Sequence, residues 1–94
     1  MALNVRLSDR ARADIEDIST YLAENFSEKA KIDFLIRLTD QLKLISEMPL
    51  MFRASTTKAG VRECVLNKHT IIYYQATDEL VKVLTIRNTK RDNA

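Results

Sequence analysis

The sequence predicts an α+β fold in which an antiparallel sheet is covered by an amino-terminal helical hairpin, in the element order β-α-α-β-β-β. Two apolar stripes with helical spacing occupy the first half of the 94-residue chain, and three short β-rich runs occupy the second half. The only Pro and the only Gly lie between the two halves, where they indicate a loop. We therefore expect a single domain over residues 1–94 with one compact core.

The first predicted element is a short strand, and the second is an amphipathic helix. Apolar and polar residues alternate from Leu3 to Leu7, as in a half-buried strand. Ser8 then offers an N-cap for a helix that runs to about Asn25. One face of this helix carries an apolar stripe, formed by Ala11, Ile15, Ile18, Leu22 and Phe26. The opposite face is acidic and is interpreted as solvated, and it comprises Asp9, Asp14, Glu16, Asp17 and Glu24.

A second helix repeats this pattern. Ser27 serves as its N-cap, and Pro49 ends it. Its apolar stripe consists of Phe34, Leu35, Leu38, Leu42 and Ile45. Because only Asn25 to Ser27 separate the two helices, they should fold back as an antiparallel hairpin whose stripes face one core. Residues 48–60 show no periodicity and are predicted to form a loop.

The strand-like runs after the loop predict an antiparallel meander: Val61–Leu66, His69–Ala76 and Leu80–Ile86. Large side chains on both faces of the middle run are typical of a central strand. Strict alternation in the last run separates two faces, one with Leu80, Leu84 and Ile86 and the other with Val81 and Val83. We expect the amino-terminal strand to pair with an edge of the same sheet, because its apolar side needs cover.

Composition excludes several classes of protein. Hydrophobic residues make up 46% and charged residues 30% of the chain, which is typical of a globular protein and not of a disordered one. The lone Cys64 cannot form an internal disulfide, and no Cys/His cluster is spaced to hold a metal. No cofactor motif is present, so no cofactor is expected. Because no apolar run approaches a membrane span and the first ten residues lack a secretory signal, we expect a cytoplasmic protein without a membrane partner.

Charge is distributed unevenly along the chain. Residues 1–47 carry 7 Lys or Arg against 9 Asp or Glu, whereas residues 48–94 carry 8 against 4. The cations of the second part are Arg53, Lys58, Arg62, Lys68, Lys82, Arg87, Lys90 and Arg91. If Arg62 and the cations after the last strand converge beside the loop that bears Arg53 and Lys58, they form a concave basic patch suited to RNA phosphates. The alternative is that these cations keep the sheet soluble, and the charge pattern alone is compatible with both.

Two potentially reactive residues occur once each, and both favour structural roles. His69 stands at the start of a strand and is interpreted as a surface or turn residue, because no orienting partner is evident. Cys64 alternates with Arg62 and Leu66 within a strand. It is interpreted as a packing residue, because no adjacent base or helix N-terminus would activate its thiol.

Several short segments occur in a characteristic order: Arg6-Leu7-Ser8, Ala11-x-x-Asp14-Ile15-x-x-Ile18-x-x-Tyr21-Leu22, Ile45-Ser46-Glu47-Met48-Pro49, Val61-Arg62-Glu63, Ile72-Tyr73-Tyr74 and Val83-Leu84-Thr85-Ile86. No single segment is specific to a protein family, because most of these segments consist of apolar residues at regular spacing. Together, from Val5 to Asp92, they resemble the RelE/ParE superfamily of bacterial type II toxin–antitoxin toxins. The chain is more similar to the ParE or plasmid-stabilisation branch than to the ribosome-dependent nucleases.

The resemblance implies a small toxin that is neutralised by a cognate antitoxin, a largely disordered segment of which wraps around it. ParE-like relatives inhibit DNA gyrase by a protein contact. RelE-like relatives cut mRNA in the ribosomal A site with basic residues and commonly a Tyr or His near the carboxyl end. After Ile86 this chain contains neither Tyr nor His, and Asn88 stands where many relatives carry His. The resemblance therefore favours gyrase inhibition over an enzymatic activity.

Two alternatives stay open from the sequence. As an mRNA endoribonuclease the chain would act on the ribosome and mRNA, and the residues expected around the cleaved phosphate are Arg53, Lys58, Arg62 and Arg91. Phosphate-binding cations without a proton-transfer partner are poor acid–base catalysts. The other alternative is a non-toxic superfamily member that acts as a binding partner. Both a homodimer and a toxin–antitoxin hetero-oligomer are compatible with the sequence.

Overall fold

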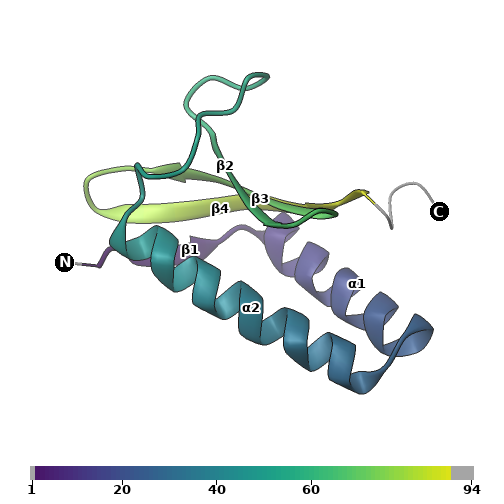
Figure 1. Ribbon diagram of the computed structural model, residues 1–94. Coiled ribbons are helices and arrows are strands. Elements are labelled where there is room, and N and C mark those ends of the chain that lie inside the picture. Colours follow the sequence, from purple (N-terminus) through teal and green to yellow (C-terminus); the bar gives the residue numbers. More distant parts are fainter. Residues whose placement is uncertain (1, 90–94) are drawn as a thin grey trace.

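The computed structural model describes residues 2–89 and has the predicted element order (Figure 1). The elements are β1 (Asn4–Leu7), α1 (Asp9–Asn25), α2 (Glu28–Glu47), β2 (Arg62–Asn67), β3 (Thr70–Ala76) and β4 (Leu80–Asn88). The two helices form a hairpin that covers one face of the sheet, and the loop between α2 and β2 rises on the other side. The predicted α+β fold is therefore confirmed, and we call the face away from the helices the open face.

The sheet is mixed and not wholly antiparallel as predicted. Its strand order is β1-β4-β3-β2, and β2, β3 and β4 form the expected antiparallel meander. β1 occupies an edge as predicted, but it runs parallel to β4, with Asn4 opposite Leu80 and Leu7 opposite Val83. This direction brings the end of β1 to the middle of β4. It thereby places the start of α1 beside the second half of β4.

Serine caps begin both helices at the predicted positions. The Ser8 Oγ accepts a hydrogen bond from the Ala11 backbone N–H at 2.9 Å, and the Ser27 Oγ accepts one from the Ala30 backbone N–H at 3.0 Å. These bonds satisfy N–H groups that have no partner inside the helix. α2 ends at Glu47, two residues before Pro49, as proline chemistry requires.

The core lies between the helical hairpin and the sheet. Its buried side chains are Ala11, Ile18, Phe34, Leu38, Ile45, Cys64, Leu66, Ile72, Tyr74, Val81, Val83 and Ile86. Both predicted helical stripes contribute to it, with one exception. Phe26 is 56% exposed and packs edge-on against Tyr21, with ring centroids 6.1 Å apart. It ends the helix as the C-cap residue, so it lies beyond the reach of the sheet.

A β-bulge in β4 overturns the predicted alternation of that strand. Tyr73 pairs with Thr85, whereas Tyr74 pairs with Val83, so Leu84 is an extra residue between two paired ones. The bulge reverses the faces of all later residues. Ile86 therefore joins Val83 in the core, and it does not share the face of Leu84 as strict alternation predicted.

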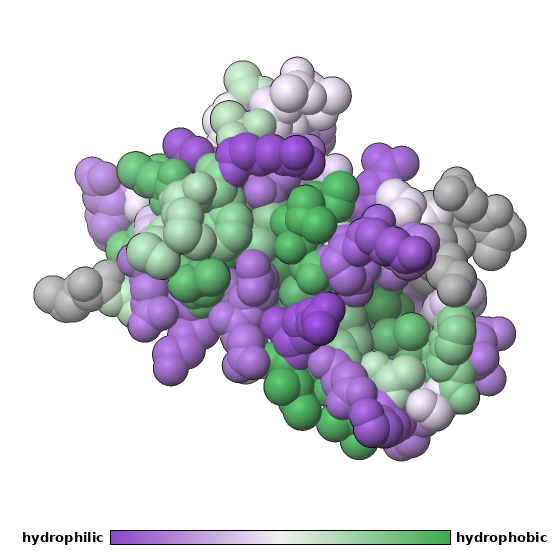
Figure 2. Space-filling model, in the orientation of Figure 1, coloured by the Kyte–Doolittle hydropathy of each residue, from purple (hydrophilic) through white to green (hydrophobic). Residues whose placement is uncertain are grey.

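Large apolar side chains remain exposed at several places: Phe26, Ile32, Ile36, Met48, Leu50, Met51 and Val65. Two of them, Ile32 and Ile36, are one helical turn apart on α2. Figure 2 shows apolar surface along the lower edge of the molecule, in the region of α2. The helical hairpin therefore buries one stripe against the sheet and leaves apolar groups on its outer side.

Candidate functional site

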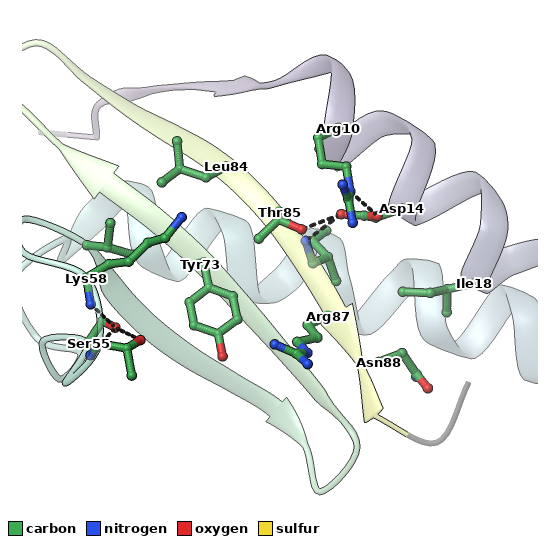
Figure 3. A pocket seen from close by; sticks show the side chains of 13 residues that line it. Arg10, Asp14, Ile18, Ser55, Lys58, Tyr73, Leu84, Thr85, Arg87 and Asn88 are labelled. Atoms are coloured by element: carbon green, nitrogen blue, oxygen red, sulfur yellow. Dashed lines mark hydrogen bonds and ion pairs between the residues drawn. The ribbon is translucent and has the colours of Figure 1, made fainter. Parts of the chain in front are cut away.

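A pocket of about 800 Å³ lies where the open face of the sheet meets α1 and the loop between α2 and β2 (Figure 3). α1 contributes Arg10 and Asp14, the loop contributes Lys58, and the sheet contributes Tyr73 and Arg87. We call it the cationic pocket, after its three basic side chains. It draws on segments that are far apart in the sequence, so only the folded chain assembles it.

The bulge in β4 determines which side chains enter this pocket. Thr85 pairs with Tyr73 and Arg87 pairs with Ile71, and all four side chains belong to the open face. Without the extra residue at Leu84, Thr85 and Arg87 would face the helices. The bulge thus turns one cation towards the ring of Tyr73, and Figure 3 shows the two side chains next to each other.

The loop that carries Lys58 is shaped by a serine turn and a glycine. The Ser55 Oγ accepts a hydrogen bond from the Lys58 backbone N–H at 3.2 Å, and the Ser55 N–H donates to the Val61 carbonyl at 2.7 Å. Gly60 has a φ of 77°, which favours glycine. The loop therefore folds back on itself, and the Lys58 side chain extends over the sheet towards Tyr73 (Figure 3).

Asp14 forms the wall of the pocket on the α1 side. Its Oδ2 accepts hydrogen bonds from the Ile86 backbone N–H at 3.0 Å and from the Thr85 hydroxyl at 2.6 Å. Its Oδ1 accepts one from the Arg10 Nε at 3.2 Å. The carboxylate is buried, so the interpretation of Asp14 as part of a solvated acidic face was wrong.

β1 is too short to pair with the whole edge of β4, and this explains why the Asp14 carboxylate is needed beside Ile86. β1 pairs with β4 only as far as Val83, and Ser8 then donates its backbone N–H to the Val83 carbonyl at 3.0 Å and its hydroxyl to the Leu84 carbonyl at 2.6 Å. The next group on that edge is the Ile86 N–H, which Asp14 binds. α1 therefore takes over from β1 as the partner of β4, because buried backbone groups must be paired.

The electrostatic balance of the pocket is positive. Asp14 is the only acidic side chain among the described residues that line it, and both of its oxygens accept hydrogen bonds. The Lys58 ammonium forms no ion pair within residues 2–89. The Arg10 side chain is 77% exposed and keeps donors beyond its bond to Asp14. These groups suit an anion.

The four residues predicted for a nuclease site do not come together in the described part of the chain. Lys58 lines the cationic pocket. Arg53 instead pairs with Glu63, at 3.0 Å between Nε and Oε1. Arg62 does not line the pocket, because its Nη1 donates to the Phe52 carbonyl at 2.7 Å. Arg91 lies outside the described residues.

Arg62 belongs to the helix-facing side of the sheet, where it stands opposite Tyr74. The Tyr74 hydroxyl donates to the Pro49 carbonyl at 2.6 Å, and its ring packs edge-on against Phe52. Burial raises the pKa of Tyr74 to about 12, although the positive charge of Arg62 acts in the opposite direction. Arg62 and Tyr74 therefore hold the start of the loop between α2 and β2 against the sheet.

Of the other cations in the second half of the chain, only Arg87 is found in the cationic pocket among the described residues. Lys82 lies on the open face of β4 but outside the pocket, opposite Gln75. Lys68 lines a second pocket, of about 840 Å³, between the tip of the helical hairpin and the β2–β3 turn. Lys90 falls outside the described residues. The predicted patch is thus smaller than expected and includes a cation, Arg10, from α1.

His69 and Cys64 have the environments that were predicted for them. His69 lies in the turn between β2 and β3, where its carbonyl accepts the Thr89 backbone N–H at 2.7 Å. It lines the second pocket and not the cationic one. Cys64 is fully buried, its Sγ accepts a hydrogen bond from the Gln41 Nε2 at 3.1 Å, and burial raises the pKa of its thiol.

Sequence reasoning missed Arg10, Asp14 and Tyr73 as members of one site. The spacing of Arg10 and Asp14, four residues apart on a helix, could have indicated their ion pair. Alternation in the central strand does place Tyr73 on the face opposite Tyr74, but it does not show which cations share that face. No local signal indicated the bulge that adds Arg87.

Other kinds of site find no support among residues 2–89. That part of the chain holds no group of three or more His, Cys, Asp or Glu side chains arranged to bind a metal ion. Neither of its helices combines the length and the apolar character needed to cross a membrane.

Comparison with known proteins identifies relatives over nearly the whole chain. Residues 5–93 match the family described as ParE toxin of type II toxin-antitoxin system, parDE. Toxin ParE1 of Caulobacter vibrioides is 32% identical over 81 residues, which cover 84% of each chain.

Solved structures share the fold at lower identity. A chain of the chromosomal ParDE system from P. aeruginosa superposes with a TM-score of 0.80 at 16% identity, covering 93% of this chain and 96% of that one. A chain of the RelBE2 toxin–antitoxin complex from Mycobacterium tuberculosis gives a TM-score of 0.61 at 16% identity, covering 94% and 99%. With these matches in sequence and fold, the chain belongs to the ParE toxin family of type II toxin–antitoxin systems, within the RelE/ParE superfamily.

Proposed function

We propose that this ParE-type toxin arrests growth by inhibiting DNA gyrase through a protein contact, and that a cognate antitoxin neutralises it. The observation that carries the proposal is the ParE-family match from residue 5 to residue 93. Inhibition by contact requires no catalytic group in the toxin.

The chemistry of the cationic pocket supports contact over catalysis. RNA cleavage by acid–base chemistry needs groups that exchange protons at the reacting oxygens. Within the described residues no histidine lines the pocket, since His69 lies at the second pocket, and the Tyr73 phenol is the group that remains for proton exchange. Both oxygens of Asp14 already hold donors, two of them from β4. A pocket of this kind is better suited to binding an anion than to breaking a phosphodiester bond.

A supercoiling assay tests the gyrase proposal. Purified toxin is added to gyrase, relaxed plasmid and ATP, and we expect supercoiling to fall as the toxin approaches stoichiometric amounts. Relaxation of the supercoiled form of this plasmid by a type I topoisomerase serves as the control and should be unaffected. Full supercoiling at a stoichiometric excess of folded toxin would contradict the proposal.

The nuclease alternative retains one favourable observation, which is that Lys58, Tyr73 and Arg87 share a pocket on the open face. A reconstituted translation reaction separates the two activities. We expect intact mRNA with the wild-type chain. Cleavage in the A site that Lys58→Ala abolishes would make the nuclease the better proposal. Lys58→Ala is more informative than Arg62→Ala, because Arg62 contacts the Phe52 carbonyl and its loss perturbs the loop.

Loss of toxicity is the third candidate, and induction of the gene in a host without the antitoxin tests it. We expect growth arrest from the wild-type chain. Normal growth, with soluble toxin visible in the cells, would instead favour a member that acts only as a binding partner.

For the antitoxin, the exposed apolar side chains of the helical hairpin offer a docking surface. Ile32 and Ile36 are 49% and 56% exposed on α2. Burying such groups under a segment that folds on binding stabilises the folded toxin by mass action. We therefore expect the toxin to melt at a higher temperature with the antitoxin encoded beside it. An unchanged melting temperature at excess antitoxin would contradict tight binding.

A further inference from the structure

We propose that the cationic pocket binds the phosphodiester backbone of single-stranded DNA without cleaving it. The inference deepens the proposed function and rests on it, because a gyrase inhibitor meets its target on DNA. It assigns the pocket a ligand of defined chemistry and gives the toxin a second contact besides that with the protein.

The arrangement of cations is the first argument. Arg10, Lys58 and Arg87 come from α1, the loop and β4, and they surround one pocket of about 800 Å³. Among residues 2–89, the acids near the pocket leave the Lys58 ammonium without an ion pair. Asp14 binds one guanidinium and the edge of β4, and Glu63 is taken by Arg53. Positive charge gathered at a concave surface attracts a polyanion.

An aromatic ring among these cations is the second argument. Tyr73 projects from the open face of β3, between Lys58 on one side and Arg87 on the other (Figure 3). Its hydroxyl makes no hydrogen bond within the described residues, so it is available to a ligand as a donor. Proteins bind single strands with a basic groove that follows the backbone and aromatic rings on which bases stack.

This combination favours nucleic acid over an acidic peptide. Carboxylates would be satisfied by the cations alone and would gain nothing from the flat ring of Tyr73. A base has a π-face for that ring, and its phosphate lies close enough to reach the neighbouring cations. A duplex keeps its bases stacked on each other, so it could use only the charges.

The test measures DNA binding by the folded chain in the absence of gyrase. A fluorescein-labelled oligodeoxythymidylate is titrated with toxin at several salt concentrations, and the affinity is read from fluorescence anisotropy. The logarithm of the association constant falls as the logarithm of the salt concentration rises. Lys58→Gln and Arg87→Gln should each make this slope shallower by about 0.7, the value for one lost phosphate contact with a single strand. Tyr73→Leu should weaken binding about tenfold with the slope unchanged, because stacking involves no counterion.

Lys82→Gln is the matched control. Lys82 lies on the same strand and the same face as Arg87 but outside the pocket, so its loss should change neither affinity nor slope. Circular dichroism verifies that every variant is folded. A slope that Lys82→Gln lowers as much as Lys58→Gln would overturn the proposal in favour of diffuse surface charge.

Three further results would also overturn it. They are the absence of saturable binding at low salt, binding of a matched oligouridylate more than tenfold tighter than the DNA, and displacement of the DNA by an equal concentration of oligoglutamate. A labelled duplex of equal length should bind more weakly than the single strand, and Tyr73→Leu should leave that binding unchanged. If the duplex instead binds more tightly, the stacking role of Tyr73 is wrong.

The outcome is independent of the gyrase assay. DNA binding that depends on Lys58 and Tyr73, together with full supercoiling by gyrase in the presence of the toxin, would support DNA binding by the cationic pocket and reject the proposed gyrase inhibition. Gyrase inhibition that persists in a Lys58→Gln variant, with no DNA binding by the wild-type chain, would do the reverse.

Discussion

The Asp14 carboxylate on α1 accepts the backbone N–H of Ile86 on β4 at 3.0 Å, across 72 residues of sequence. The same oxygen accepts the hydroxyl of Thr85. One acidic side chain therefore anchors the first helix to the last strand, forms a wall of the cationic pocket and holds Arg10 at its rim.

Removal of this carboxylate should destabilise the toxin strongly. Asp14→Ala leaves the buried Ile86 N–H without its partner, and we expect a loss of about 2–3 kcal/mol in the free energy of unfolding. For a chain of this size the melting temperature should fall by about 10 °C or more. Asp14→Asn keeps an acceptor oxygen and should lose less. Glu16→Ala, an exposed position on the same helix, is the control and should stay within about 0.5 kcal/mol of wild type.

The two capping serines should differ in importance, although both look alike in the sequence. Ser27 only caps α2, and Ser27→Ala should cost about 1 kcal/mol. Ser8 also donates its hydroxyl to the Leu84 carbonyl, so Ser8→Ala should cost about 2 kcal/mol. Urea unfolding of the two variants gives the comparison. Equal losses would show that the Leu84 bond adds nothing to the cap.

Stability should fall at high pH because of Tyr74. Its pKa is raised to about 12 in the folded chain, against about 10 in the unfolded chain. The protonated phenol is therefore favoured by folding, and its contribution is complete below pH 10 and is lost as the pH rises from about 10 to 12. Tyr74→Phe lacks this titration. It should also be about 1 kcal/mol less stable at neutral pH, because the hydrogen bond to Pro49 is gone. Unfolding curves for both proteins across that pH range measure the difference.

The Cys64 thiol should be unreactive in the native protein. Its side chain is fully buried and its pKa is raised, so both access and thiolate formation are unfavourable. Ellman's reagent should modify native toxin only at the rate at which the chain opens, and modification should become immediate in denaturant. Rapid labelling of native toxin would mean that the sheet opens locally around β2.

Features that depend on local periodicity could be predicted from the sequence. Both helices begin at the serines that were expected to cap them. The central strand was recognised from large side chains on both faces, as at Ile72 and Tyr73. In each case the decisive neighbours are within a few residues, and the hydrophobic pattern reports them directly.

The direction of β1 and the composition of the cationic pocket could not be predicted, because they depend on distant pairings. The bulge at Leu84 leaves no mark on apolar alternation, and it decides the face of Arg87. In the sequence, Asp14 cannot be told apart from the solvated acidic residues of α1. Its role becomes visible only in the fold, where it accepts the Ile86 N–H on the edge of β4. Charges could be counted from the sequence, but their convergence requires the tertiary fold.

The parallel pairing of Asn4 with Leu80 has a consequence for biosynthesis. While the chain is being made, the first strand must wait without a partner until the last strand has emerged, because nothing in between can substitute for it. Partial products therefore lack both the closed sheet and the α1 anchor at Ile86. The folded toxin can therefore form only after β4 has been synthesised.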